Sequence, residues 1–201
     1  MSDSALKIGD TATVTLQFSE AVTGFSSDAD VTVQNGSLAT MTSSDNITWT
    51  GTFTPSSDVE DATNVMSLAT SYTDTAGNAG PSATTDNYEV DTIRPTVAAF
   101  TMSDTALISG ETSTVTLQFS EAVASFSSDD DITVQNGSLA TMTSSDNITW
   151  TGTFTPTSDV EDATNVLTLA TTYTDTAGNA PASTSVSDNY EIDTIAPTMT
   201  I

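Results

Sequence analysis

The sequence is an almost complete internal duplication. Residues 14–22 (VTLQFSEAV) return letter for letter at 115–123, and residues 33–55 return unchanged at 134–156. The offset then grows by one residue, because one residue is inserted between Ala180 and Asp188. Solenoid repeats have periods of roughly 20–50 residues, whereas this period has the length of an independent domain. The sequence therefore predicts two tandem domains, 1–93 and 94–195, followed by a short segment, 196–201.

Composition excludes several classes of function. The chain has no cysteine and no histidine, and Lys7 and Arg94 are its only basic side chains against 27 acidic ones, which gives a net charge of −25. Thiol nucleophiles, histidine bases and Cys/His zinc sites are therefore excluded. Nucleic-acid binding requires a basic surface, and insertion into a membrane requires about 20 consecutive apolar residues, so neither is expected. So many carboxylates call for high salt or for bound divalent cations.

Apolar and polar residues alternate along most of the chain, which is typical of half-buried strands. The pattern is clear at 14–18 and 47–54, which are rich in threonine, valine and aromatic residues. In the second repeat we expect seven strands, at about 96–101, 112–119, 131–135, 139–144, 147–154, 165–174 and 186–192. Seven short strands in about 100 residues favour an immunoglobulin-like β-sandwich. The predicted fold class is therefore all-β, with two such sandwiches arranged end to end.

Three local predictions follow from residue type. Asn35-Gly36 predicts a tight turn, since such turns require positive φ. Trp49 and Trp150 are expected to fill the space between the two sheets rather than to bind a ligand. The acidic stretch 57–62 is the only candidate for a helical turn, and the alternative is an acidic loop.

The two ends of the chain do not match. Residues 89–96 form a short linker that contains a proline and should be stiff, and this linker is repeated at 191–198. Met1-Ser2-Asp3 aligns with Met102-Ser103-Asp104, so the first domain lacks a counterpart of the predicted first strand, while 197–201 begins such a strand. Either the sequence is a piece of something longer, or the end of one chain supplies the missing strand of another.

Several carboxylates are expected to meet at one pole of the second sandwich, where alternate loops gather. They are Asp91 from the linker, Glu121 after the second strand and Asp175 from the loop 173–179. The run Asp129, Asp130 and Asp131 is near enough to add a ligand, and Asp130 is the residue chosen from it. Like charges repel unless a cation lies among them, and oxygen donors without nitrogen or sulfur favour calcium. We therefore predict an interdomain Ca²⁺ site. The alternatives are a solvated acidic surface and, for Asp175, an Asx-type turn.

The duplication implies further, incomplete copies of this cluster. Glu20 and Asp74 are the equivalents in the first domain, and Asp193 is the equivalent of Asp91 at the C-terminal end. A second, weaker cluster is predicted at the opposite pole of the first domain, from Asp3, Asp10, Asp58, Glu60 and Asp61.

Three motifs together resemble a known family. The segments 18–22 (FSEAV), 72–78 (YTDTAGN) and 90–95 (VDTIRP) are similar to bacterial Ig-like repeats of giant surface adhesins, including the calcium-stabilised extender repeats of type I-secreted RTX adhesins. The resemblance implies a calcium-rigidified stalk on the bacterial cell surface. Its partners would be neighbouring Ig-like repeats of the same or identical chains.

The leading functional hypothesis is therefore a structural extender outside the cell and not an enzyme, because one active site gains little from tandem copies. The alternative is a self-assembling filament or surface-layer subunit joined head to tail by strand donation. Binding of sugar or ice is less favoured: only 6% of residues are aromatic, and the threonine rows at 48–54 are ordinary strand residues.

Overall fold

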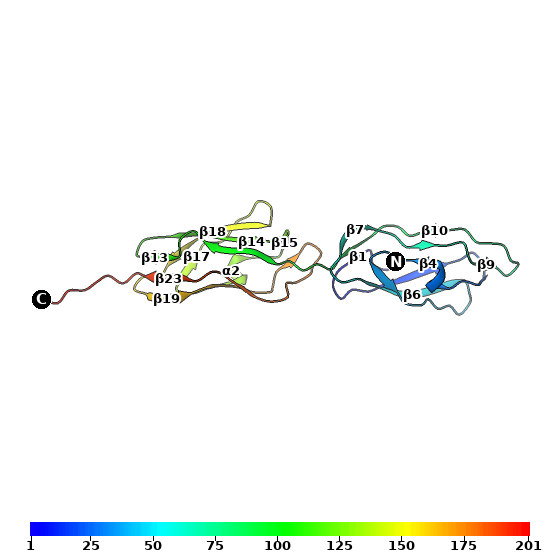
Figure 1. Ribbon diagram of the computed structural model, residues 1–201, viewed down its shortest axis with the longest axis horizontal. Coiled ribbons are helices and arrows are strands. Elements are labelled where there is room, and N and C mark those ends of the chain that lie inside the picture. Colours follow the sequence, from blue (N-terminus) through cyan, green and yellow to red (C-terminus); the bar gives the residue numbers. More distant parts are fainter. The chain divides into compact units, whose positions relative to one another are not determined.

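The chain folds into two separate β-rich units, described by a computed structural model that covers residues 1–201. Unit 1 comprises Met1–Ile93 and unit 2 comprises Arg94–Ile201. Each unit is built from short strands and contains one helical turn. Figure 1 draws the strands of both units as arrows. The prediction of two tandem all-β domains is confirmed.

Unit 2 contains every element of the fold. Its elements are β12 (Val97–Met102), β13 (Ala106–Ile108), β14 (Ser113–Phe119), β15 (Val123–Ala124), α2 (Ser128–Asp131), β16 (Ile132–Val134), β17 (Gly137–Leu139), β18 (Thr149–Pro156), β19 (Glu161–Asn165), β20 (Leu167–Leu169), β21 (Thr174–Asp175), β22 (Ser185–Val186) and β23 (Tyr190–Asp193). One four-stranded sheet has the order β12-β14-β18-β17. The remaining strands form the smaller sheets β13-β23-β19, β16-β20-β22 and β15-β21.

Strand β14 illustrates how the alternating pattern builds the core. Its side chains are buried at every second position, so Val115, Leu117 and Phe119 face inward. They join the core formed by residues such as Phe154 and Tyr190. The intervening threonines face away from the core, as period-two strands require. The strands predicted at 112–119 and 147–154 are therefore observed with nearly the expected bounds.

Three strands of unit 2 were not predicted, namely β13, β15 and β19. β13 pairs in parallel with β23, and β19 pairs with β23 in antiparallel fashion. The counterpart of β19 in unit 1, β7 (Glu60–Asn64), occupies part of the stretch for which a helical turn or an acidic loop was predicted. Only Asn64 of that strand is buried, so no hydrophobic alternation marks it, and it is held by backbone pairing to β11 (Tyr88–Asp91).

The helical turn lies elsewhere, at α1 (Ser27–Asp30) and α2, so a turn at 57–62 was the wrong choice. In α2 the Asp131 side chain is 5% exposed and accepts a hydrogen bond from the Ser127 N–H at 2.9 Å. It also accepts one from the Thr172 hydroxyl. These contacts hold the four-residue turn in place without any helical hydrophobic pattern.

The Asn-Gly turn and the tryptophans each differ in part from expectation. Asn35 has φ of 49°, as predicted, but the turn links strands of two different sheets instead of closing a hairpin. Gly36 is required by packing, since a Cβ there would lie 2.2 Å from the ring of Phe53. Trp49 and Trp150 are half-buried and pack at the margin of their cores, so they do not fill the centre.

Unit 1 repeats this plan with one strand fewer. Its elements are β1 (Ala5–Leu6), β2 (Ala12–Gln17), β3 (Val22–Thr23), α1, β4 (Val31–Thr32), β5 (Gly36–Leu38), β6 (Thr48–Pro55), β7, β8 (Ser67–Leu68), β9 (Thr73–Asp74), β10 (Ala83–Thr84) and β11. Its main sheet has the order β2-β6-β5, with no counterpart of β12. Strand β2 is therefore an edge strand, whereas its equivalent β14 is central.

Candidate metal centre

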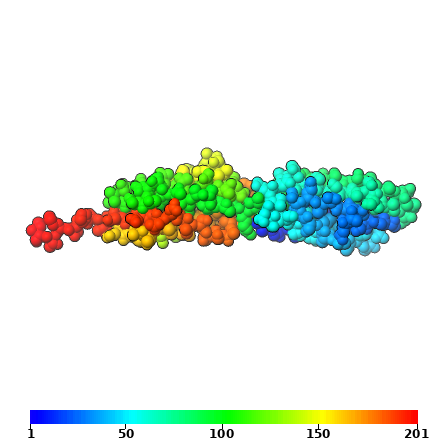
Figure 2. Space-filling view, viewed as in Figure 1, coloured from blue at the N-terminus to red at the C-terminus, as the bar shows by residue number.

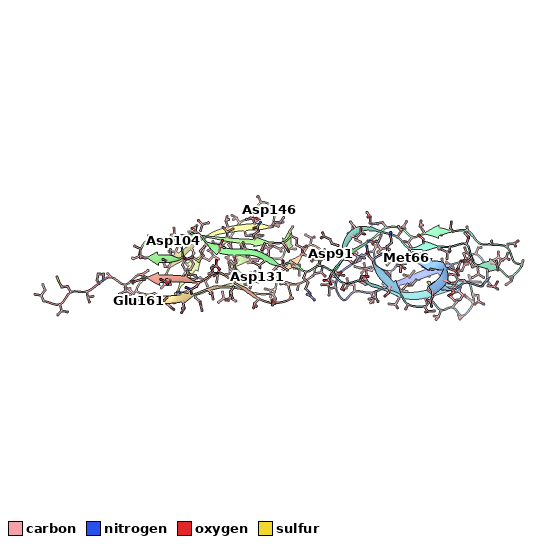
Figure 3. The ribbon with its side chains drawn as sticks, viewed as in Figure 1. Met66, Asp91, Asp104, Asp131, Asp146 and Glu161 are labelled. Carbon is pink, nitrogen blue, oxygen red and sulfur yellow. The ribbon has the colours of Figure 1, made fainter.

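Three strand ends supply the acidic residues that the sequence singled out. Asp91 is the last residue of β11, Glu121 follows β14, and Asp175 is the last residue of β21. Asp91 and Asp175 are still paired within their sheets, with Glu60 and Val123 respectively, and regular strand structure ends directly after each of them. Figure 3 labels Asp91 at the end of its strand.

The carboxylates of these three residues converge. One oxygen from each of Asp91, Glu121 and Asp175 lies within 4.8 Å of the other two. Asp175 is fully buried, and the other two are half-buried. At an effective dielectric of about 20, two unit charges at such a distance repel by about 3.5 kcal/mol. The arrangement therefore favours a bound cation or another compensating interaction.

Asp175 is held in place by its own loop. Its Oδ1 accepts hydrogen bonds from the N–H groups of Gly178 at 2.7 Å and Asn179 at 2.8 Å, and its Oδ2 accepts one from Asn179 Nδ2 at 2.8 Å. Gly178 has φ of 97°, which explains the glycine in this loop. This is the Asx-type turn given as the alternative, and it uses three of the about four acceptor positions of a carboxylate. The turn and a metal site are therefore compatible.

The donor set fits a hard cation. All three side chains offer oxygen only. Because both acceptor positions of Asp175 Oδ1 are used, the three carboxylates can supply up to five oxygens, whereas Ca²⁺ takes six to eight. Asn179, which is 2% exposed, is the residue that sequence reasoning passed over, although it belongs to the 173–179 loop. Its signal is the spacing from Asp175, because an asparagine four residues on can close the turn with its side chain.

The other predicted ligands do not join this group. Asp130 is exposed on α2, while its neighbour Asp131 points inward. Asp193 is exposed at the end of β23, and its Oδ1 accepts the Ile195 N–H at 3.2 Å. Glu20 is exposed. Asp74 is half-buried and bonded to Asn78 Nδ2 at 2.6 Å, which, with nearby backbone N–H groups, lowers the pKa of the Asp74 carboxyl.

The second predicted cluster includes one carboxylate with a cationic partner. Lys7 Nζ lies 2.8 Å from Asp10 Oδ1, and this contact lowers the pKa of the Asp10 carboxyl. Asp61 accepts a hydrogen bond from Asn35 Nδ2 at 2.8 Å. Both carboxylates therefore have partners within unit 1.

Comparison with known proteins identifies the family. A search of curated proteins found no match to the chain. No helix in it has the length and apolar character needed to cross a bilayer. The family model described as bacterial Ig-like domain matches twice, at residues 1–90 and 91–192, and the second match contains all three residues of the acidic cluster. The chain therefore belongs to the bacterial Ig-like domain family, a non-catalytic structural family typical of surface proteins, and carries two of its domains in tandem.

Proposed function

We propose that the chain is an extender segment of a bacterial cell-surface adhesin. The observation that carries this proposal is that two family domains of nearly identical sequence account for residues 1–192. Repetition adds length with every copy, whereas it would add nothing to a single active site. The acidic surface, with a net charge of −25, suits a chain that stays dissolved outside the cell.

Calcium is the second part of the proposal. The convergence of Asp91, Glu121 and Asp175 supports a bound Ca²⁺ that fastens the end of β11 to the two turns of the second domain. Extracellular modules bind calcium with dissociation constants of about 10⁻⁴–10⁻³ M. Calcium present at 100 times the dissociation constant would stabilise the fold by about 2.7 kcal/mol per site. The linker would then be stiff outside the cell and looser where calcium is scarce.

A thermal melt at fixed ionic strength tests the cation. Calcium should raise the melting temperature relative to a chelator, and Asp175→Asn or Asp91→Asn should abolish the rise. The matched control is Asp188→Asn, which removes the same charge at an exposed position outside the cluster. An equal calcium response in all variants would show that the carboxylates act only as a diffuse charge.

Rigidity needs its own measurement. The chain has no cysteine, so dyes can be attached at Ser44→Cys and Ser145→Cys, two exposed and equivalent positions. The distribution of energy-transfer efficiencies should narrow when calcium is added and should stay broad in the Asp91→Asn variant. A distribution that calcium leaves unchanged would contradict rigidification even if calcium binds.

A further inference from the structure

We propose that the Asn-Gly turn of each unit is a site of spontaneous deamidation that folding suppresses. The two turns are Asn35-Gly36 in unit 1 and Asn136-Gly137 in unit 2. While a unit is folded, the side-chain amide of the asparagine is held in place. Once the unit has unfolded, the amide is converted to a carboxylate, and this carboxylate opposes refolding. The modification depends neither on the extender role nor on the calcium centre.

The reaction consumes water and needs no enzyme. The backbone nitrogen of Gly36 loses its proton to hydroxide and attacks the side-chain carbon Cγ of Asn35. A C–N bond forms and closes a five-membered succinimide ring, while the bond from Cγ to Nδ2 breaks and Nδ2 takes up a proton from water and leaves as ammonia. Water then adds to one of the two ring carbonyls and gives aspartate or isoaspartate. Glycine favours the attack because it has no side chain and its backbone is flexible.

In the folded unit 1 the Asn35 amide is held by two acceptors. Its Nδ2 donates to Asp61 Oδ2 at 2.8 Å and to Asn64 Oδ1 at 2.7 Å. Asn64 is fully buried, and its own Nδ2 donates to the backbone oxygens of Asp61 and Tyr88, so the atom that it presents to Asn35 is an oxygen. Both N–H groups of the Asn35 amide are therefore used.

Unit 2 repeats these contacts. Asn136 Nδ2 donates to Asp162 Oδ2 at 2.9 Å and to Asn165 Oδ1 at 2.7 Å. Asn165 is 1% exposed, and its Nδ2 donates to the backbone oxygens of Asp162 and Tyr190. The same arrangement of donors and acceptors thus holds the asparagine of both turns.

These side-chain contacts keep the reacting atoms apart. Ring closure requires Cγ of Asn35 to move onto the nitrogen of Gly36. That nitrogen does not pair with β6: Ser56 N–H donates to Asn35 C=O, so the adjoining pair Gly36–Pro55 is a non-hydrogen-bonded pair of the antiparallel ladder. The hydrogen bonds from the side-chain amide to β7 are therefore what prevents the attack.

The fold requires both residues of the reactive pair. Asn35 has φ of 49°, a conformation in which asparagine is several-fold enriched among residues other than glycine. A Cβ at Gly36 would lie 2.2 Å from the ring of Phe53, and one at Gly137 would lie 2.2 Å from the ring of Phe154. Packing and backbone conformation thus retain a dipeptide that is chemically unstable once it is released from the fold.

The product of deamidation does not fit the folded unit. An oxygen would replace Asn35 Nδ2 and would face the carboxylate of Asp61 and the side-chain oxygen of Asn64. Two hydrogen bonds would become contacts between acceptors, one of them between like charges. Isoaspartate would also lengthen the backbone by one carbon, at a turn that links strands of two different sheets. A unit that deamidates while unfolded would therefore refold less favourably.

Mass spectrometry of the unmodified chain tests the site. The chain is incubated in a mildly alkaline buffer, folded in one sample and unfolded by guanidinium chloride in the other. Cyanogen bromide then cleaves after methionine in acid. The fragments 2–41 and 103–142 each contain a single asparagine, Asn35 and Asn136 respectively, so the conversion of each turn is measured separately. Both fragments should deamidate at least tenfold faster in the unfolded sample than in the folded one.

Asn46 is the matched control in unit 1. It is exposed and has φ of 58°, but it precedes Ile47, whose side chain hinders ring closure. Asn147 is its equivalent and belongs to the loop 143–148, which Figure 2 shows in yellow on the surface of unit 2. In the unfolded sample Asn46 should deamidate at least tenfold more slowly than Asn35. Equal rates at these two residues, or equal rates at Asn35 in the folded and unfolded samples, would overturn the proposal.

Asn35→Asp reproduces the aspartate product and tests the block on refolding. It should lower the folded-to-unfolded ratio of unit 1 by about tenfold or more, because buried acceptors are left without a donor. Chemical denaturation followed by Trp49 fluorescence in a Trp150→Phe background measures this ratio. Asn46→Asp adds the same charge outside the network and should change the ratio little. An Asn35→Asp variant as stable as the unmodified chain would overturn the block.

A second substitution keeps this test decisive where Asn35→Asp does not fold at all. Asp61→Asn in the same chain restores a donor opposite the new carboxylate and removes the like charge, so it should recover part of the lost stability. Asp61→Asn alone is measured beside it. A loss that the second substitution leaves unchanged would show that the contact with Asp61 is not the cause, and would contradict the proposed block.

Discussion

Residues 13–18 of unit 1 and 114–119 of unit 2 are identical (TVTLQF), yet their side chains are buried to different extents. Leu16 and Phe18 are half-buried, whereas Leu117 and Phe119 are almost completely buried. The equivalent acidic loops differ in the same way: Asp74 in unit 1 is half-buried, and Asp175 in unit 2 is fully buried. The difference teaches that burial is a property of the completed sandwich, since β14 is covered by a neighbouring strand and β2 is not.

The largest expected effect comes from truncating Phe100, the side chain of β12 that belongs to the core of unit 2. Phe100→Ala should destabilise unit 2 by about 3–5 kcal/mol, because it empties a core position and leaves a cavity. Chemical denaturation followed by Trp150 fluorescence in a Trp49→Phe background measures unit 2 alone. Thr101→Ala, at an exposed position on the same strand, is the control and should change little. An unchanged midpoint for Phe100→Ala would mean that β12 contributes no core.

A matched pair of leucines sharpens the comparison. Leu117→Ala should lower the free energy of unfolding of unit 2 by about 2–5 kcal/mol. Leu16→Ala should lower that of unit 1 by about 1–2 kcal/mol, because the Leu16 side chain buries less apolar surface when the unit folds. Each loss is measured with the single tryptophan of its own unit, at a concentration where sedimentation shows monomers. Equal losses would indicate that the β2 edge is covered in solution.

Tyrosine ionisation gives a smaller effect with a defined sign. Burial raises the pKa of Tyr173 to about 12, aided by the nearby Asp131, and burial also raises the pKa of Tyr190 to about 12. Burial raises the pKa of Tyr72 as well. The folded state therefore retains protons that the unfolded state loses, so the stability of unit 2 should fall as pH rises from about 10 to about 12.

Ultraviolet difference absorbance during an alkaline titration checks this prediction. The two tyrosines of unit 2 should ionise late, and Tyr173→Phe should remove one of the late steps. Ionisation of all four tyrosines near pH 10 would show that the core of unit 2 is open to solvent.

The smallest expected effect is a backbone one. Ser125 has φ of 60°, while its equivalent in unit 1 is Gly24 with φ of 74°. A left-handed conformation costs a serine about 1 kcal/mol more than a glycine, so Ser125→Gly should stabilise unit 2 by about 0.5–1 kcal/mol. Gly24→Ser should destabilise unit 1 by a similar amount. Thermal melts of the two reciprocal variants test the pair, and shifts of the same sign would contradict the explanation.

The sequence predicted those strands that bury the side chains of one face in the core and expose those of the other. The alternation at 14–18 and 47–54 predicted β2 and β6 because burial repeats with the strand period. It could not predict β7, which is stabilised by backbone pairing and shows only one buried side chain. Nor could it predict α2, since a four-residue turn fixed by Asp131 has no period at all.

The acidic site was predictable for a different reason. Asp91, Glu121 and Asp175 each stand at a strand end, so counting strands was enough to bring them to one pole. The run 129–131 was included because its loop was expected at the same pole, and Asp130 was chosen from it. Asp130 is exposed, however, and Asp131 is buried with hydrogen bonds from Ser127 and Thr172. Within a single helical turn, position in the sequence alone therefore does not predict which carboxylate is buried and which is exposed.

The identity of residues 33–55 and 134–156 has a consequence for folding fidelity. Strand β6 pairs with β2 and strand β18 with β14 in the same register, and the residues are identical at every paired position except Ala12 and its equivalent Ser113. Either β6 or β18 would therefore fit either partner strand closely. Apart from that one position, side-chain chemistry in these pairs does not distinguish native from exchanged pairing. Only chain connectivity can: Leu16 is about four times farther along the chain from Trp150 than from Trp49, and closing the longer loop costs about 1.2 kcal/mol more. During synthesis from the N-terminus, β2 can pair with β6 before β18 has been made. The order of synthesis therefore favours native pairing over exchanged pairing.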